Sequence, residues 1–182
     1  HPDHWVDLAG LETAWTHIFR RQGLRVLGTP GTRERATGLI GDLAPTIEWT
    51  DLADGDHARV GELQLDFSAT DHYVETLAVR VSEGGSSMAY FADTGPSWSF
   101  AALGDQLDLA LCEATNLADG EGDGVLHLSA RQAGAMARAA GVERLVLTHL
   151  LPGVDPAAAQ AEGTEAFGRA VDVTSIHAQF DV

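Results

Sequence analysis

The stretch His1-Pro2-Asp3-His4 begins the chain, and three of its four residues carry side chains that commonly bind a catalytic divalent metal. A tight turn at the end of a strand can direct such closely spaced side chains into one pocket. Neutral imidazole combined with carboxylate suits zinc, with iron or manganese as alternatives. Taken alone the tetrapeptide is a weak signal, because a histidine at an N-terminus can also be a tag remnant or a frayed end.

The composition is that of a globular protein. A chain of 182 residues can enclose a sizeable core, and its hydrophobic fraction of 45% is ordinary. No apolar run is long enough to span a bilayer and no signal-peptide pattern is present, so we predict no membrane association and a cytoplasmic location. Cys112 is the only cysteine, which excludes an intrachain disulfide and fits a reducing compartment.

The charge argues against a nucleic-acid partner. The formal net charge is -16, from 27 acidic and 11 basic residues, and every basic residue is arginine. Binding of a polyanion needs cations that neutralise phosphates, and a chain this acidic repels it. The arginines at 20, 21 and 25 and those at 33 and 35 are close in sequence. A local basic patch is the alternative there, and solvated helix faces are the favoured interpretation.

Hydrophobic periodicity predicts a single α/β domain over residues 1–182. From residue 87 onward strands and helices alternate, whereas residues 46–82 have antiparallel β character, with His57 in a turn. We predict residues 116–124, rich in Gly and Asp, to be a mobile loop. The predicted helices cover 6–22, a dozen residues ending near 43, a short turn from 97, 129–140 and 155–168. The predicted strands cover 24–28, 46–52, 60–70, 73–81, 87–92, 107–111, 142–148 and one within 171–182.

Several polar residues stand where predicted strands end. His72, Asp93, Glu113 and His149 each follow or close an apolar run. In folds of sheets and helices, ligands bind at the ends of strands. Considered singly, His72 would be a solvated loop histidine, His149 a strand-end histidine and Asp93 a turn former. Taken together with the N-terminal tetrapeptide, they form a set suited to two metal ions.

In order along the chain, these residues resemble the motifs of the metallo-β-lactamase superfamily. Residues 1–4, followed by Asp7-Leu8-Ala9-Gly10-Leu11, resemble the second half of the H-x-H-x-D-H motif. Asp71-His72-Tyr73-Val74 and Leu147-Thr148-His149 match two later ligand positions, and Phe91-Ala92-Asp93-Thr94-Gly95 resembles the S-G-D-T motif. One such match would be weak, but ordered matches over essentially the whole chain are specific.

Two further motifs resemble one branch of that superfamily, which contains tRNase Z and phosphodiesterases. Cys112-Glu113-Ala114-Thr115 is similar to its H-E-A-T motif, and His127-Leu128-Ser129-Ala130 is similar to its H-S-T-A motif. The resemblance implies a four-layer αββα sandwich of the α/β class. Residues 1–182 would form the C-terminal three quarters of such a domain, lacking its N-terminal β segment.

The chain departs from the family pattern in two places. The first histidine of H-x-H-x-D-H would precede His1 by two residues, so we expect the sequence to be a fragment or to have lost a preceding segment. A protein of these residues alone is expected to bind metal poorly and to expose part of its core. Cys112 replaces the usual histidine before Glu113, which we expect to alter a contact behind the ligands rather than a ligand itself.

The resemblance implies a role for each matching residue. His1, His72 and the absent histidine would hold one metal, and Asp3, His4 and His149 the other, with Asp93 as a bridge. The pair would be two divalent ions, zinc first, with manganese or iron as alternatives. Such a pair would lower the pKa of a shared water and make hydroxide available near neutral pH.

The resemblance also implies the catalytic residues. His127 would protonate the leaving oxygen or stabilise the charge developing there, while Glu113 orients its ring. Asp3, besides being a ligand, would accept the proton of the attacking water. Without the family pattern, His127 would be interpreted as a surface histidine beside a loop. We assign no role to the other histidines, at 17, 57 and 177.

The sequence therefore predicts a metal-dependent hydrolase that acts on a phosphodiester or a similar small ester. A tRNA 3′-processing endonuclease is one alternative, disfavoured by the net charge and by the short distance in sequence from His72 to Asp93, which leaves no room for an inserted substrate arm. A lactonase, thioesterase or β-lactamase-type hydrolase and a degenerate binding module without activity are the others. The predicted partner is a small-molecule substrate, and a homodimer is one expectation because dimers are common in such families.

Overall fold

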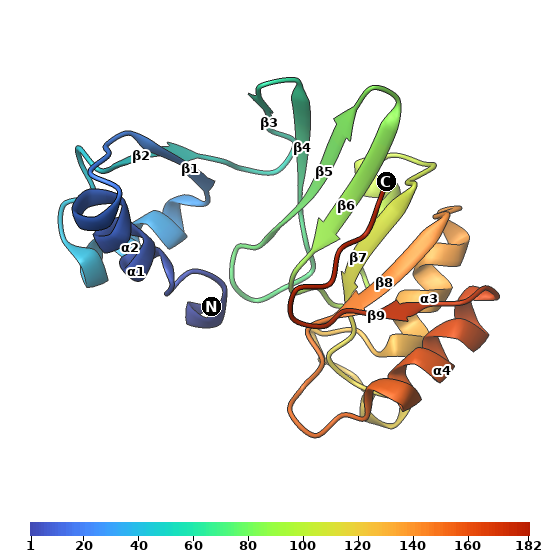
Figure 1. The fold of residues 1–182 in the computed structure, drawn as a ribbon. Helices are drawn as coiled ribbons and strands as arrows, with labels where there is room; N and C mark the ends of the chain where they lie inside the picture. Colours follow the sequence, from blue (N-terminus) through green and yellow to red (C-terminus); the bar gives the residue numbers. More distant parts are fainter. The chain divides into compact units, whose positions relative to one another are not determined.

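The computed structural model describes residues 1–182, which form two compact units (Figure 1). The N-terminal unit is His1–Ala53 and the C-terminal unit is Asp54–Val182. The prediction of one domain over residues 1–182 stays a prediction. No helix in either unit is both long enough and apolar enough to cross a bilayer.

The N-terminal unit contains a βαβ element. Strands β1 (Leu24–Gly28) and β2 (Ile47–Asp51) pair in parallel, and helix α2 (Pro30–Ile40) connects them. Thr29 begins this helix, because its side chain accepts a hydrogen bond from the backbone N–H of Thr32. The two strands confirm those predicted at 24–28 and 46–52, and the predicted helix after residue 31 is confirmed with an end at Ile40. The antiparallel character predicted for 46–82 is wrong for β2, because the helix that connects β1 to β2 returns the chain in the same direction.

The first predicted helix is shorter and less regular than the periodicity indicates. A 3₁₀ turn η1 (Pro2–His4) precedes α1 (Leu8–Thr13), which continues as a π-helical turn η2 (Ala14–Ile18). The helix stops before Gln22, where the sequence predicts its end, because Arg20 adopts a left-handed φ of 53° that a helix cannot accommodate.

The C-terminal unit is built on one seven-stranded mixed sheet. Its first three pairings are antiparallel and its last three are parallel, which confirms the predicted change from antiparallel to alternating character. In spatial order the strands are β3 (His57–Val60), β4 (Leu63–Ala69), β5 (Leu77–Glu83), β6 (Ser86–Phe91), β7 (Leu109–Glu113), β8 (Arg144–Thr148) and β9 (Asp172–Val173).

Three details of this sheet differ from the prediction. His57 begins strand β3 instead of lying in a turn, because the chain reverses at Gly61, which takes a positive φ of 62°. Residues 73–76 form a loop rather than the start of a strand, because the backbone N–H of Thr70 binds the carbonyl of Thr76 and closes the chain on itself. The last strand has only two residues, and residues 174–182 run on without regular structure.

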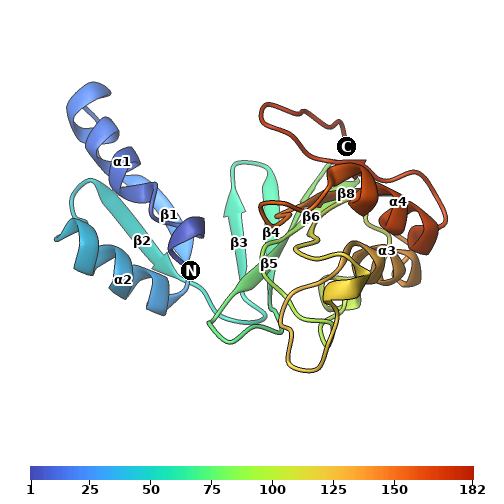
Figure 2. The ribbon, with the colours of Figure 1, turned by 90° about the horizontal axis from the view of Figure 1, so that it is seen from below.

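Helices cover one face of the sheet. Helix α3 (Ala130–Ala139) packs on β7 and β8, and α4 (Pro156–Phe167) packs on β8 and β9 (Figure 2). Ser129 caps α3, in a reciprocal capping box with Gln132. The helices approach closely, since a Cβ on Gly134 would lie 2.5 Å from the carbonyl oxygen of Gly163. The apolar core between helices and sheet includes Phe91, Phe100, Leu128, Leu145, Leu147 and Phe167.

Two short 3₁₀ turns complete the unit. The turn η3 (Phe100–Leu103) replaces the short helix predicted from residue 97, and η4 (Ala118–Gly120) lies within the predicted loop 116–124. That loop is anchored at its base, because Asn116 pairs with Ser129 in an isolated bridge. The backbone N–H of Ala118 also donates to Glu162 of α4. The loop is therefore tied to both helices.

Candidate metal centre

The parallel strands end at one edge of the sheet, and the polar residues that follow them meet there. The register pairs Phe91 with Cys112 and Glu113 with Thr148, so β6, β7 and β8 end side by side. Asp93 lies two residues beyond β6, Glu113 ends β7, and His149 follows β8 directly. Because parallel strands end at the same edge of a sheet, Asp93, Glu113 and His149 lie close together although they are far apart in sequence.

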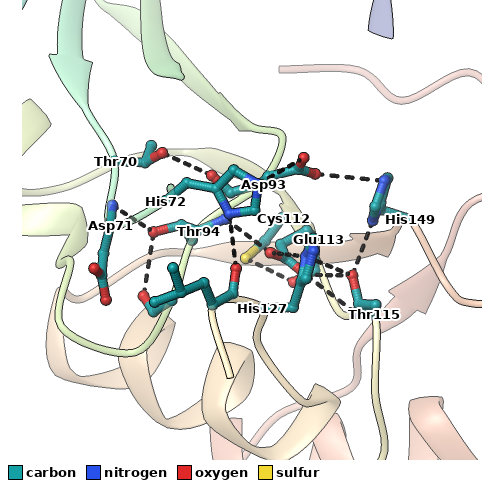
Figure 3. A network of polar contacts seen from close by, with 12 residues as sticks. Thr70, Asp71, His72, Asp93, Thr94, Cys112, Glu113, Thr115, His127 and His149 are labelled. Atoms are coloured by element: carbon teal, nitrogen blue, oxygen red, sulfur yellow. Dashed lines mark hydrogen bonds and ion pairs between the residues drawn. The ribbon is translucent and has the colours of Figure 1, made fainter. Parts of the chain in front are cut away.

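Asp93 lies between two histidines (Figure 3). Its side chain is buried, with 2% of the residue exposed. Its Oδ2 atom is 3.4 Å from Nε2 of His72, and its Oδ1 atom is 3.4 Å from Nε2 of His149. Each carboxylate oxygen therefore faces a different imidazole, an arrangement that suits a bridging ligand.

His72 is oriented from behind by a backbone carbonyl. Its Nδ1 atom lies 2.9 Å from the carbonyl oxygen of Leu126, and a carbonyl oxygen can only accept a hydrogen bond. The ring therefore carries a proton on Nδ1. In the neutral ring, Nε2 then turns a lone pair toward Asp93, which is the arrangement found behind metal-binding histidines.

Glu113 is the buried anchor of the site, with an exposed fraction of 0%. Its Oε1 atom accepts from the backbone N–H of Thr94 at 2.8 Å and from Nδ1 of His127 at 3.0 Å. Its Oε2 atom accepts from the hydroxyl of Thr115 at 2.6 Å and from the backbone N–H of the same residue at 3.2 Å. Four donors converge on two oxygens, which a carboxylate satisfies and a protonated acid could not.

Thr115 extends this network to a second histidine. Because its single hydroxyl proton is donated to Glu113, the oxygen must accept from Nδ1 of His149, which lies 2.9 Å away. The same oxygen is 3.2 Å from Nδ1 of His127. Both imidazoles therefore carry their proton on Nδ1, like His72, and all three rings adopt one tautomer.

The backbone of His149 adopts a strained, left-handed conformation at the end of β8. This residue has a left-handed φ of 58°, which costs a non-glycine residue about 1–3 kcal/mol. Such conformations persist where surrounding contacts hold them, and here the hydrogen bond to Thr115 does so. The ring of His149 lies nearly parallel to that of His127, with centroids 5.7 Å apart and 14° between the planes.

These donors fit a divalent cation by their chemistry. Two atoms bound at about 2.1 Å to one tetrahedral ion lie roughly 3.4 Å apart, the separation found between Asp93 and each neighbouring imidazole. In the neutral tautomer both rings turn lone pairs toward the carboxylate, and a cation would remove the repulsion between them. Imidazole nitrogen with carboxylate oxygen is a donor set that zinc accepts, as do iron and manganese.

His127 is also within ligand distance. Donor atoms of Asp93, His127 and His149 all lie within 4.8 Å of one another. The sequence assigns His127 a catalytic role and not a ligand role, and its contact with Glu113 suits both, since a carboxylate behind a histidine orients a ligand and a proton donor alike. The metal content of a His127 variant separates the two roles.

The predicted ligands at the start of the chain belong to the other unit. His1 precedes the 3₁₀ turn η1, and Asp3 and His4 lie within it, with Nε2 of His4 at 3.3 Å from Oδ2 of Asp3. The metal-binding roles of His1, Asp3 and His4 and the proton-accepting role of Asp3 stay predictions.

Cys112 lies in the apolar core of the C-terminal unit. Its side chain is buried among core residues, and its thiol donates to the carbonyl of Glu113 at 3.2 Å. Burial, together with the charge of Glu113, raises the pKa of the thiol well above its usual value. Its contact with Glu113 is therefore made through the backbone, and the thiol is held in its neutral, unreactive form.

The sequence analysis assigns no role to several residues that support the site. Thr115 is the last residue of the Cys112–Thr115 motif, so its position could have suggested its part in the network. Leu126 contributes only a carbonyl oxygen, which no residue type reveals. Glu121 accepts from Ser129 at 2.5 Å and pairs with Arg131, holding the loop that leads to His127. Burial acts to raise the pKa of Glu121, but these hydrogen bonds and the arginine charge outweigh it and lower the pKa.

Comparison with known proteins identifies the family. A family model described as a β-lactamase superfamily domain matches residues 1–150. The chain belongs to the metallo-β-lactamase superfamily. The resemblance inferred from the motifs is thereby confirmed, and with it membership in a superfamily of metal-dependent hydrolases, which implies that this chain binds divalent metal.

Relatives of this metallo-β-lactamase superfamily chain are found in bacteria. An uncharacterised protein of Mycobacterium tuberculosis is 31% identical over 163 residues, which are 84% of this chain and 59% of the relative. The probable metallo-hydrolase YhfI of Bacillus subtilis is 33% identical over 161 residues, covering 82% of this chain and 62% of YhfI. The chain thus spans about three fifths of the length of these curated relatives.

The crystal structure of YhfI supports the predicted fold. It matches with a TM-score of 0.84 and 24% identity over 96% of this chain and 71% of YhfI. This likeness confirms the metallo-β-lactamase-like fold. A ribonuclease Z of Mycobacterium sp. (strain KMS) is 28% identical over 225 residues, covering 100% of this chain and 72% of that enzyme. That alignment is longer than the 182 residues of the chain, so the ribonuclease contains inserted residues that the chain lacks.

Proposed function

We propose that this protein is a hydrolase that uses two divalent metal ions, zinc first, to cleave a phosphodiester or a similar small ester. The observation that carries the proposal is Asp93, whose two oxygens each face the Nε2 atom of a different histidine, His72 and His149. In the C-terminal unit these three residues would hold the metal. When bound, divalent ions lower the pKa of water and neutralise negative charge on the substrate.

The protein's own residues would position the histidines and move the proton. Leu126 and Thr115 fix the rings of His72 and His149 through their Nδ1 atoms. His127, whose Nδ1–H is held by the buried carboxylate of Glu113, would protonate the leaving oxygen through Nε2. The negative charge of Glu113 stabilises the imidazolium form that this step requires.

The phosphodiester preference is supported by the motifs around Glu113 and His127. Both residues lie in motifs that resemble those of the tRNase Z and phosphodiesterase branch. Nδ1 of His127 contacts the carboxylate of Glu113, which also accepts hydrogen bonds from Thr94 and Thr115. Transfer of tRNA processing from the ribonuclease Z relative is disfavoured by the net charge of -16 and by the residues that this chain lacks. A small substrate, a cytoplasmic location and a homodimer remain part of this proposal.

A substrate panel tests the proposal. The purified chain is loaded with zinc and assayed with bis(p-nitrophenyl) phosphate, a cyclic nucleotide, a lactone and a precursor tRNA. We expect turnover of at least one small phosphodiester and none of the lactone. Turnover of the lactone alone would assign a lactonase-type hydrolase, cleavage of the precursor tRNA alone would assign 3′ processing, and no turnover of any substrate by metal-loaded protein would assign a binding module.

A further inference from the structure

His72 lies in the loop after β4, and Asp93 lies in the loop after β6. Hydrogen bonds join these two loops directly. The hydroxyl of Thr70 donates to the carbonyl oxygen of Asp93 at 2.7 Å. The other contacts all involve Asp71. Figure 3 shows this residue beside His72, on the side away from His149.

Asp71 contacts the second loop through three of its groups. Its backbone N–H donates to the hydroxyl of Thr94 at 3.3 Å, and its carbonyl oxygen accepts from the N–H of Gly95 at 2.6 Å. Its carboxylate Oδ2 accepts from the N–H of Ser97 at 3.1 Å. Asp71 thus contacts three residues of the loop that follows Asp93, at positions 94, 95 and 97.

Gly95 is required by the closeness of this contact. A Cβ at residue 95 would lie 2.5 Å from Oδ2 of Asp71, a distance that real Cβ atoms do not show. The φ of Gly95 is not positive, so space and not backbone conformation excludes a side chain there. The two loops are therefore packed as closely as backbone and carboxylate allow.

The carboxylate of Asp71 is not positioned as a metal ligand. It belongs to none of the groups whose donor atoms lie within ligand distance of one another, and its Oδ2 is committed to the backbone of Ser97. The neighbouring His72 nonetheless has to be placed accurately, because ligand distances tolerate changes of only about 0.2 Å.

We propose that Asp71 is a positioning residue, which braces the loop of His72 against the loop of Asp93 and sets the separation between Nε2 of His72 and Oδ2 of Asp93. This inference rests on the metal centre of the proposed function. Residues that support ligands from behind typically change metal affinity by about 10–100-fold when they are removed.

The test compares zinc affinities, measured by competition with a chromophoric chelator, in the wild type and three single variants. Asp71→Ala is expected to lose at least about tenfold in affinity. Asp71→Asn retains an oxygen that can accept the Ser97 N–H, so it should stay within about threefold of the wild type. Glu75→Gln, which removes one negative charge from an exposed position in the same loop, is the matched control and should change nothing.

A double variant tests whether the two loops act through this contact. Gly95→Ala alone should weaken zinc binding, because its Cβ collides with the Asp71 carboxylate. In Asp71→Ala/Gly95→Ala the colliding carboxylate is gone, so the combined loss should be clearly smaller than the product of the two single losses. Hydrogen exchange of the Ser97 amide in metal-free protein should be slow in the wild type and fast in Asp71→Ala.

Each result decides a different point. Equal zinc affinity in the wild type and in folded Asp71→Ala would contradict the positioning role of Asp71 and would leave the proposed metal centre intact. An Asp71→Asn variant as weak as Asp71→Ala shows that the negative charge matters instead of the hydrogen bond, and also overturns that role. A wild-type chain that binds no zinc overturns the metal centre itself, and this inference with it.

Discussion

The hydroxyl oxygen of Thr115 lies 2.6 Å from Oε2 of the buried Glu113. Because that oxygen also accepts from His149, one carboxylate orients two histidines, one directly and one through a hydroxyl. His127 and His149 are thus coupled through a single buried charge, although 22 positions separate them in sequence.

Thr115→Val should weaken metal binding without greatly changing the shape of the site. The valine fills the same volume but neither donates to Glu113 nor accepts from His149, so the His149 ring loses its fixed tautomer. We expect about a 10–100-fold loss of zinc affinity, measured by chelator competition. Thr148→Val, at the end of β8 and without a side-chain hydrogen bond of this kind, is the control. Equal zinc affinities in Thr115→Val and Thr148→Val would show that the hydroxyl of Thr115 does not orient His149.

Glu113→Gln should destabilise the fold. Glutamine keeps one acceptor oxygen and replaces the other with an NH2 group, which would face the backbone N–H of either Thr94 or Thr115 and leave a buried donor without an acceptor. We expect the free energy of unfolding of metal-free protein to fall by about 3 kcal/mol in urea denaturation. The exposed Glu143→Gln serves as control. A loss below about 0.5 kcal/mol, the usual effect of a surface substitution, would contradict the four-donor description.

His127→Ala should reduce turnover by about 10²–10⁴-fold while the bound zinc stays unchanged. Zinc is measured by atomic absorption after gel filtration, and turnover is measured with the substrate identified by the panel. The reasoning is that His127 moves the proton and other residues hold the metal. Loss of zinc in a folded variant would instead make His127 a ligand, as its distance to Asp93 and His149 also allows.

Cys112 should be unreactive in the native protein. Burial and the adjacent Glu113 raise its pKa, so the thiolate is scarce in the folded state even at mildly alkaline pH. Because the folded pKa is the higher one, this thiol's contribution to stability is complete below the unfolded pKa and is lost as pH rises through the folded pKa. We expect labelling by a thiol reagent at pH 8 only after denaturant is added. Rapid labelling of native protein would contradict the buried position.

The sequence predicts those parts of the fold that follow from local patterns. The strands β1, β6 and β8 are close to their predicted places, since short apolar runs between turns admit few other structures. The helix α3 follows its capping residue Ser129. The early helix is misjudged because the left-handed Arg20 ends it, which periodicity does not reveal.

The site is predictable only where a side chain carries the chemistry. His72, Asp93 and His149 stand at strand ends, and the family motifs add Glu113 and His127. Contacts made by backbone groups, such as the carbonyl of Leu126 behind His72 or the amide of Ser97 on Asp71, depend on how loops fold in space. The residue types do not predict these backbone contacts, so only the structure reveals them.

The central claim is that divalent metal at Asp93 and its neighbouring histidines drives hydrolysis, and the dependence of turnover on bound zinc tests it most directly. The metal-free chain is titrated with zinc while hydrolysis of bis(p-nitrophenyl) phosphate is followed, in the wild type and in Asp93→Asn. We predict no turnover without zinc, a rise that saturates as the zinc concentration increases, and little turnover in Asp93→Asn at any zinc concentration. Turnover that is independent of zinc, or equal in the two proteins, would contradict the account.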